Sequence, residues 1–379
     1  MTEMKESNRK RNLLFGLGGG CLGLCLLLVV VVVIVAILQA SKPQSQTEGP
    51  IPQPVVGISS ESLDDVRELY VLPQDGWVAD VAWSPDGLTL AAAMPGTGND
   101  PGAVQWWNMV NGTRLRTFDQ ININRLAFSP DGQFLAAAGR EMIMVWRLSD
   151  GSELINIPLS TISQNQVAFS PDGRIFAYSS EKTIHLLEMP AGGEVKPFQH
   201  ESKVMDFVFM PDGKSLISTT IIEGEGYGDT LFTVWDVENG QVVDTFMRPG
   251  GIDELAITPD GCTLAGSFSM QTLRIWDAPD GQERQVISGF RFGVPRFAFS
   301  ADGSVLAAGE GRGFETASPS RLRLFPLTDG HEVPMLEGHT GVITSVAFSP
   351  DGRYLATASE DRTVRLWGIP AVMNTQLAP

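Results

Sequence analysis

The chain has little cysteine and little histidine, the residues that most often bind metals or act as nucleophiles and bases. Its 379 residues include three cysteines and four histidines. Cys21 and Cys25 lie in one hydrophobic run and Cys262 stands alone, which leaves the globular part without a disulfide framework or a CxxC pair. HExxH, GxSxG and phosphate-loop motifs are missing too. The sequence therefore predicts no metal, no cofactor and no enzyme active site.

Positive charge is also scarce. Lysine and arginine number 27 against 44 aspartates and glutamates, and the net charge is -17. An acidic body without a basic stripe repels a phosphate backbone, which argues against a nucleic-acid partner. An acidic surface that serves solubility is a more ordinary explanation than an acidic recognition surface.

One long hydrophobic run, residues 13–38, contains no charge and no proline and predicts a transmembrane helix. At about 1.5 Å per residue it would extend roughly 39 Å, enough to cross a hydrocarbon core of ~30 Å. A cleaved signal is the alternative, but its apolar region is only about 7–15 residues long. Arg9, Lys10 and Arg11 precede the run and only Lys42 follows closely. The positive-inside rule then predicts a cytoplasmic tail over residues 1–12 and a single-pass membrane protein whose remainder lies outside the cytoplasm.

Two neighbouring features complete the expected N-terminal region. Small residues spaced by four can bring two membrane helices together, and the pairs here are Gly16/Gly20 and Gly19/Gly23. A homodimer could form through this face, but the more ordinary explanation is that glycine is common in membrane helices. Residues 39–63 are rich in Pro, Gln and Ser and predict a flexible stalk.

The remaining sequence is a repeat array. The tetrapeptide Ser84-Pro85-Asp86-Gly87 recurs, with some substitutions, at about 40–50-residue intervals, beginning at Ser129, Ser170, Met210, Thr258, Ser300 and Ser349. Each copy lies between two apolar segments, and a β-branched run and a glycine turn follow. Proline presets φ at the first central position of a type I turn, and glycine supplies the left-handed conformation that closes a bulged hairpin. Seven copies at this spacing predict seven units of four strands.

These units resemble WD repeats. The segment Leu355–Trp367, LATASEDRTVRLW, is similar to a nearly full WD signature, and the WD dipeptide itself occurs at Trp235-Asp236 and Trp276-Asp277. The resemblance implies an all-β fold, a seven-bladed β-propeller of four-stranded antiparallel blades over residues 64–370, followed by a tail over 371–379. The seventh unit lacks its outer strand, and residues 64–72 have the pattern of one. We expect them to complete the last blade and to close the ring.

In the WD family, His, Ser or Thr, Asp and Trp form a structural hydrogen-bond network within a blade. The resemblance implies that only the seventh blade can build this network, from His339, Ser359 or Thr357, Asp361 and Trp367. The other blades are expected to rely on packing.

Three units are longer than the rest, and their extra residues fall between the second and third strands. In the family geometry these connections emerge on one face, where long loops on a rigid scaffold often carry the functional surface. Neutral drift of loop length is the alternative, and a calcium site built from the loop carboxylates fits no known ligand spacing. Tyr227, Arg312 and Phe314 are the stronger candidates because aromatic and arginine side chains dominate contact hot spots. The candidate partner-binding residues are Asn99, Asp100, Glu223, Glu225, Tyr227, Asp229, Arg312, Phe314 and Glu315.

These features favour a non-catalytic, membrane-anchored scaffold whose propeller binds a protein or peptide outside the cytoplasm. Two alternatives stay open. One is a propeller enzyme of the hydrolase, lyase or lactonase type with a site at the channel mouth, and the other is a ligand-sensing receptor.

Overall fold

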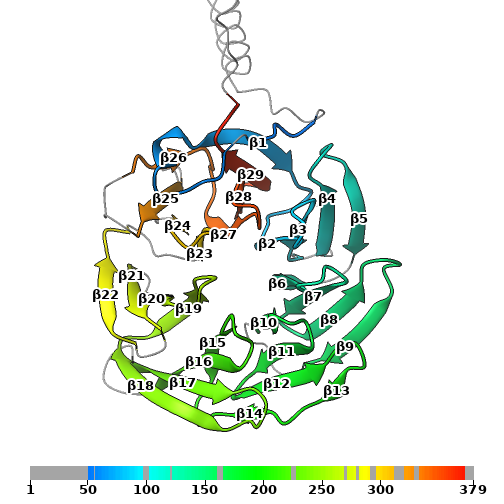
Figure 1. The fold of residues 1–379 in the computed structure, drawn as a ribbon. Coiled ribbons are helices and arrows are strands. Elements are labelled where there is room, and N and C mark those ends of the chain that lie inside the picture. The colour runs from blue at the N-terminus through cyan, green and yellow to red at the C-terminus, as the bar shows by residue number, and fades with distance from the viewer. Residues whose placement is uncertain are drawn as a thin grey trace, which may run out of the picture. The chain divides into compact units, whose positions relative to one another are not determined.

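A computed structural model of the chain describes residues 50–371 except 55, 97–101, 120–121, 160–164, 223–227, 269–270, 279–280, 291–295, 311–319 and 328–332. The described residues form seven antiparallel sheets, which are arranged as blades around a central axis (Figure 1). The all-β, seven-bladed fold expected from the repeats is confirmed.

Blades 1–4 follow the chain, and each begins with the strand nearest the axis. Blade 1 consists of β2 (Asp80–Trp83), β3 (Thr89–Met94), β4 (Ala103–Asn108) and β5 (Arg114–Asp119). Blade 2 consists of β6 (Ile123–Phe128), β7 (Phe134–Gly139), β8 (Met142–Arg147) and β9 (Glu153–Pro158). Blade 3 consists of β10 (Val167–Phe169), β11 (Ile175–Ser180), β12 (Thr183–Glu188) and two short outer strands, β13 (Gly193–Glu194) and β14 (Phe198–Gln199). Blade 4 consists of β15 (Val204–Phe209), β16 (Ser215–Ile222), β17 (Asp229–Asp236) and β18 (Val242–Pro249).

Blades 5–7 complete the ring. Blade 5 consists of β19 (Ile252–Ile257), β20 (Thr263–Phe268), β21 (Thr272–Asp277) and β22 (Glu283–Ile287). Blade 6 consists of β23 (Phe297–Phe299), β24 (Val305–Gly309), β25 (Arg321–Pro326) and β26 (Leu336–Glu337). Blade 7 consists of β27 (Ile343–Phe348), β28 (Leu355–Ser359), β29 (Thr363–Gly368) and β1 (Arg67–Pro73). A 3-10 turn, η1 (Leu63–Asp65), precedes β1.

The pairing of β1 with β29 closes the ring, as the missing fourth strand of the seventh unit predicts. Glu68 lies opposite Trp367 and Leu72 opposite Val364 in the antiparallel register. Buried side chains of β1 share a cluster with blades 7 and 1. The strand therefore joins the two ends of the described body both through its backbone and through its apolar face.

Residues 50–63 require a correction, because we assigned them to a flexible stalk. Ile51, Ile58 and Leu63 are buried, and the amide of Ile58 donates to the carbonyl of Gly352 at 2.8 Å. The hydroxyl of Tyr354 donates to the carbonyl of Pro52 at 2.8 Å. The Pro-rich composition suggested a linker, but its isolated isoleucines and leucine fit apolar sites on the propeller and hold this segment against it.

The predicted membrane localisation is corrected as well. Within the described part of the chain, no helix is long and apolar enough to cross a membrane. The run 13–38, the glycines 16, 19, 20 and 23 and the tail 1–12, on which the N-in topology and the homodimer were based, lie outside the described residues.

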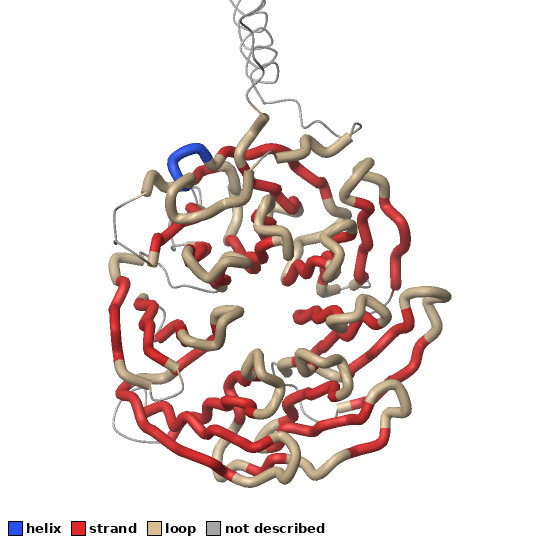
Figure 2. The backbone as a smooth tube through the Cα atoms, viewed as in Figure 1, coloured by secondary structure: helices blue, strands red, loops and turns tan. Residues whose placement is uncertain are grey.

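The repeated tetrapeptide forms the turns that join the first and second strands of the blades, which are the strands closest to the central axis (Figure 2). In blade 2, the hydroxyl of Ser129 donates to Asp131 at 2.6 Å, and Asp131 accepts the amide of Gln133 at 2.9 Å. Gly132 has a φ of 68°, and a Cβ placed there would lie 3.7 Å from the ring of Pro85, in the turn of the preceding blade. The same glycine-to-preceding-proline approach recurs at Gly87, Gly173, Gly213, Gly261 and Gly303. The tetrapeptide thus shapes each turn and also spaces it from its neighbour.

We predict that replacing Leu72 by Ala destabilises the whole propeller. Leu72 on β1 is 1% exposed, so the lost burial and the resulting cavity should lower the free energy of unfolding by about 2–5 kcal/mol. Urea unfolding followed by tryptophan fluorescence measures this change.

The matched control is Val71→Ala on the same strand, where the side chain is half-buried, and it should cost less than about 1.5 kcal/mol. Equal effects of the two substitutions would contradict a specific role for the inward face of β1.

Candidate functional site

The connections between the second and third strands lie on one face of the propeller. In blade 1, Ala103 pairs with Met94 on one side and with Asp119 on the other. The long connection and the link to the next blade therefore leave from the same end of the sheet. We call this end the loop face, and the end that carries the tetrapeptide turns the turn face.

Each long connection begins and ends on paired strands. Ile222 lies opposite Asp229 in blade 4, and Gly309 lies opposite Leu322 in blade 6. Of the predicted partner-binding residues, Asp229 is described: it is exposed at the start of β17 and bridges to Gly250. Eight others, Asn99, Asp100, Glu223, Glu225, Tyr227, Arg312, Phe314 and Glu315, lie outside the described residues.

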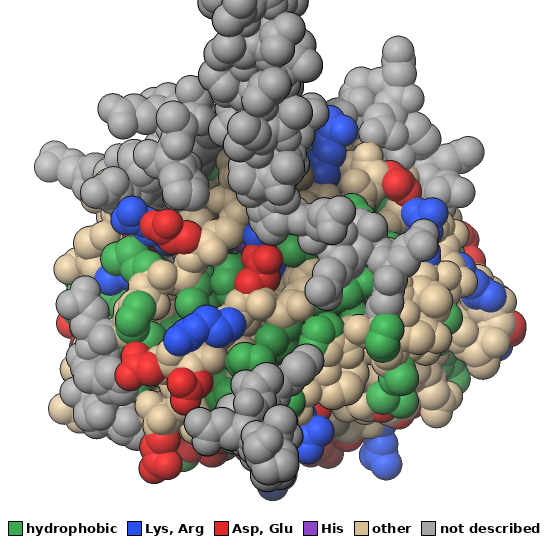
Figure 3. Space-filling view, turned by 90° about the horizontal axis from the view of Figure 1, so that it is seen from above, with side chains coloured by type: hydrophobic (Ala, Val, Ile, Leu, Met, Phe, Trp, Pro, Cys, Tyr) green, Lys and Arg blue, Asp and Glu red, His purple; other side chains and the backbone are tan. Residues whose placement is uncertain are grey.

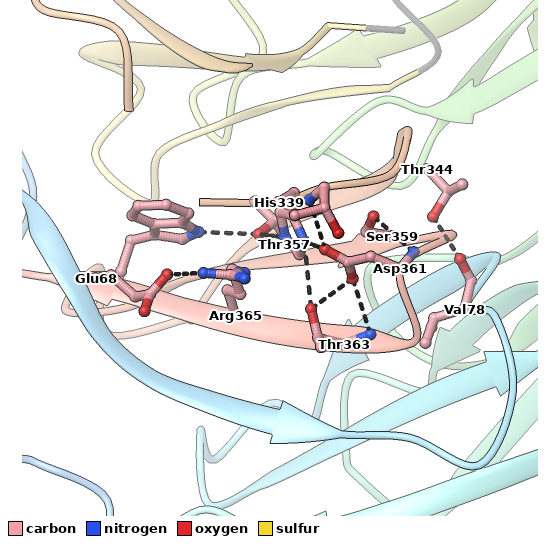
Figure 4. Close-up of polar contacts among 11 residues, drawn as sticks. Glu68, Val78, His339, Thr344, Thr357, Ser359, Asp361, Thr363 and Arg365 are labelled. Atoms are coloured by element: carbon pink, nitrogen blue, oxygen red, sulfur yellow. Dashed lines mark hydrogen bonds and ion pairs between the residues drawn. The ribbon is translucent and has the colours of Figure 1, made fainter. Parts of the chain in front are cut away.

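Blade 7 contains the hydrogen-bond network that the WD resemblance implies (Figure 4). Nε2 of His339 lies 2.7 Å from the hydroxyl of Thr357, and the indole Nε1 of Trp367 donates to that same hydroxyl at 2.9 Å. Nδ1 of His339 lies 2.9 Å from Asp361. Asp361 also accepts the backbone amide of Thr340 at 2.9 Å. The network therefore joins the loop before β27 to β28 and β29.

The structure decides between the two hydroxyls left open by the sequence. Thr357 bridges the histidine and the tryptophan, whereas Ser359 accepts the amide of Asp361 at 3.1 Å. Thr357 and Ser359 lie two residues apart on β28 and therefore share one face of the strand, but it is Thr357 that both His339 and Trp367 reach. Ser359 supports the turn instead, so its placement in the bridging position is corrected.

The electrostatics of this network keep its charges fixed. Burial lowers the pKa of His339, even though the bond to Asp361 opposes that shift. Burial acts to raise the pKa of Asp361, but bonds from His339, Thr363 and Thr340 outweigh it and hold this pKa well below its usual range. A carboxyl group whose pKa is depressed in the folded state stabilises the fold at any pH above its unfolded pKa. That stabilisation is lost only as the pH falls through the folded pKa. The network therefore stays intact from neutral to moderately acidic pH.

A second network, in blade 4, was missed by the sequence reasoning. Nε2 of His200 lies 2.8 Å from the hydroxyl of Ser218, and the indole Nε1 of Trp235 donates to the same hydroxyl at 2.8 Å. In blade 4, Ile222 occupies the position that Asp361 holds in blade 7, and it is the last residue before the long connection. Among the described residues the four-residue network is found in blade 7, as expected, but the expectation that the other blades rely on packing is wrong for blade 4. The sequence did offer one signal: His200 precedes the tetrapeptide turn of blade 4 by the same number of residues as His339 precedes that of blade 7.

Blade 1 has the same arrangement with its bridging hydroxyl missing. Trp107 lies where Trp367 lies, Gln74 replaces the histidine, and Ala92 stands where Thr357 provides the oxygen. The indole Nε1 of Trp107 and Oε1 of Gln74 are both buried without a hydrogen-bond partner. Buried polar atoms of this kind weaken a fold by about 1–3 kcal/mol each.

The described residues include no group of three or more His, Cys, Asp and Glu side chains that could hold a metal ion. His185 pairs with Glu194 at 2.8 Å and stacks on Tyr178, and His200 and His339 belong to the two networks. The described histidines therefore have structural partners in three different blades.

We predict that Ala92→Ser stabilises the protein by repairing blade 1. Its hydroxyl can accept from the indole of Trp107 and donate to Gln74, which should raise the free energy of unfolding by about 1 kcal/mol. Chemical denaturation of the variant beside the parent protein gives the difference.

Ala136→Ser is the control, because Ala136 is equally buried on the matching strand of blade 2 among apolar side chains. This hydroxyl lacks a partner there and should cost about 1–3 kcal/mol. If both serines destabilise equally, the inferred repair of blade 1 does not occur.

Two family descriptions match parts of the chain. The family described as WD domain, G-beta repeat, matches residues 330–368, which contain the blade 7 network. The family described as Eukaryotic translation initiation factor eIF2A matches residues 61–182, which include β1 and the first two blades.

Curated proteins also match parts of the chain. "Target of rapamycin complex subunit wat1" of Schizosaccharomyces pombe is 25% identical over 55% of this chain and 54% of its own length. "Periodic tryptophan protein 2" of Arabidopsis thaliana is 26% identical over 65% of this chain and 29% of its own. "Small ribosomal subunit protein RACK1" of Glycine max is 34% identical over 23% of this chain and 26% of its own. The chain thus spans about half or less of the length of these relatives.

The repeated turns, the four-stranded blades, the His–Thr–Trp network and the family match over blade 7 agree with one another. The chain is a WD-repeat protein whose described part is a seven-bladed β-propeller.

Proposed function

We propose that this propeller is a non-catalytic scaffold that binds a protein or peptide partner on its loop face. The observation that carries the proposal is the position of the long connections. Those of blades 1, 4 and 6 all start from rigid, paired strand ends on the same face. Variable loops on a rigid scaffold are where binding residues concentrate.

The relatives support the same role. Two of them are named as components of larger assemblies, a target of rapamycin complex subunit and a small ribosomal subunit protein. A binding function also fits the chemistry of the body, since the described histidines are engaged in structural contacts. A propeller enzyme would instead need His and acidic side chains that converge at one channel mouth.

The charge distribution favours a protein partner over a nucleic acid. On the side of the body seen in Figure 3, Lys and Arg side chains are interspersed with Asp and Glu and do not gather into one stripe. With a net charge of -17, the chain has no electrostatic advantage on a phosphate backbone. The partner-contacting residues are proposed to be those of the three long connections, Asn99, Asp100, Glu223, Glu225, Tyr227, Asp229, Arg312, Phe314 and Glu315.

Site-specific photocrosslinking in the native cell tests the proposal. A photoreactive residue is placed in the full chain at Arg140, Lys182 or Asp229, exposed positions on the loop face. We expect these positions to capture one protein in common, at yields that fall when the connection of blade 4 is shortened.

Gln133 and Lys214, which are exposed on the turn face, serve as matched controls and should capture that protein weakly. Equal capture from the two faces, or capture from the turn face alone, would reject binding through the loop face.

A further inference from the structure

β18 is the longest of the outer strands that the structure describes. It lies on the rim of the ring, where it pairs with β17 on its inner side (Figure 1). Most of its residues are exposed, and Val242, Val243 and Met247 are large apolar side chains with exposed fractions of 50%, 65% and 50%. An exposed edge strand offers a row of backbone N–H and C=O groups to which another strand can add.

Two hydrogen bonds show which backbone groups of β18 point away from the blade. The amide of Thr245 donates to the carboxylate of Asp244 at 2.8 Å. The carbonyl of Met247 accepts from Nη1 of Arg248, also at 2.8 Å. In an antiparallel pair, successive residues turn their backbone groups alternately toward and away from the neighbouring strand. Thr245 and Met247 therefore face outward, and their bonding partners are exposed side chains of β18 itself.

Asp244 and Arg248 have no ion-pair partner within the part of the chain that the structure describes. The carboxylate of Asp244 accepts the neighbouring amide. The guanidinium of Arg248 lies 4.9 Å from the ring centre of Phe246 and donates to the carbonyls of Met247 and Gly281. Because side chains alternate along a strand, the two charges stand on one face of β18, on either side of Phe246.

β18 is complementary to itself when two copies pair antiparallel about Phe246. In this register Asp244 of each copy lies opposite Arg248 of the other, so each charge gains an ionic partner. Opposed Cα atoms at such positions are only about 4.5 Å apart, which suits oppositely charged side chains. Thr245 lies opposite Met247 of the second copy, and their outward N–H and C=O groups can exchange hydrogen bonds.

The balance of bonds favours this pairing. Asp244 releases the amide of Thr245, and Arg248 releases the carbonyl of Met247. Backbone bonds between the copies and symmetric ion pairs replace these local bonds. Val243 and Met247 lose contact with water at the same time, which is favourable. An unrelated extended peptide would need an acid and a base at the same spacing, whereas a second copy supplies both by symmetry.

We propose that β18 is a self-association edge, through which two copies of this chain pair by antiparallel strand addition about Phe246. The pairing uses the same surface on both copies, so it closes as a dimer and does not extend into a fibre. It is independent of the proposed partner binding, because it uses the rim and not the long connections.

Sedimentation equilibrium of the full chain over a concentration series tests the proposal. One strand from each copy makes a small interface, so we expect the parent to dimerise with a Kd of about 10–100 µM. Asp244→Arg opposes like charges at both ends of the pairing, and Arg248→Asp does the same with carboxylates. Each variant alone should therefore dimerise about tenfold more weakly or worse.

An equimolar mixture of the two variants is the decisive sample. In a mixed dimer the arginines of one copy again lie opposite the aspartates of the other, which should restore the parent's Kd to within about threefold. Association through any other part of the chain would not depend on this combination of charges.

Leu115→Lys is the matched control, because Leu115 is a half-exposed apolar residue on the outer strand of blade 1. It should dimerise as the parent does. Val243→Lys changes an equally accessible residue on β18 and should weaken the dimer. If Arg248→Asp does not fold, Asp244→Arg and Val243→Lys decide together. A parent that stays monomeric throughout the series, or that dimerises no better than Asp244→Arg, would overturn the proposal.

Discussion

The hydrogen-bonded pairing of β1 with β29 is the constraint on which the rest of this propeller depends. A blade buries both of its faces only when it has a neighbour on each side, and the first and last blades gain theirs only if the ring closes. The register from Arg67 opposite Gly368 to Pro73 opposite Thr363 provides that closure. The seam between blades 7 and 1 is reinforced further inward, where the indole of Trp83 donates to the carbonyl of Ala347 at 3.1 Å.

Within the closed ring, the blades differ in how they are held together. Blades 4 and 7 use a hydroxyl that joins a histidine to a tryptophan. Blade 1 keeps the tryptophan without its hydroxyl. Blade 5 does the same, because Gly266 occupies the position that Thr357 holds in blade 7 and the indole Nε1 of Trp276 has no partner. These blades tolerate an unsatisfied indole because their faces pack in apolar clusters shared with neighbouring blades. Apolar packing between blades is thus the general source of stability, and the networks add to it locally.

Much of the fold could be predicted from the sequence, because the tetrapeptide marks every blade and the strand missing from the last unit points to residues 64–72. Less of the structural detail could be predicted in this way. The stalk was expected to extend to residue 63, since three buried apolar residues, Ile51, Ile58 and Leu63, are too widely spaced to form a periodic pattern. The blade 4 network lacks its aspartate, so a search for complete motifs passes over it. Thr357 and Ser359 share one face of β28, so the choice between them depends on which of the two the histidine and the tryptophan reach, and the letters alone do not give that.

The hydrogen bonds that join neighbouring inner strands could not be anticipated for a related reason. The residues four positions before each tetrapeptide turn share a position and not a residue type, so no motif connects Asp80 with Arg125 or Glu254. Their relation appears only when the ring brings the inner strands together.

The same geometry explains why the two faces of the propeller can be used so differently. On the turn face, six of the seven tetrapeptide glycines lie near the proline of the preceding turn, as Gly132 does near Pro85, and Gly352 lies near Ala301 instead. An insertion there would separate two blades and disturb both. On the loop face, the connections between second and third strands leave paired strand ends and can lengthen without changing the spacing between blades, as those of blades 1, 4 and 6 do. A surface that varies from blade to blade can therefore develop on the loop face at little cost to stability, which is why we propose that face for partner recognition.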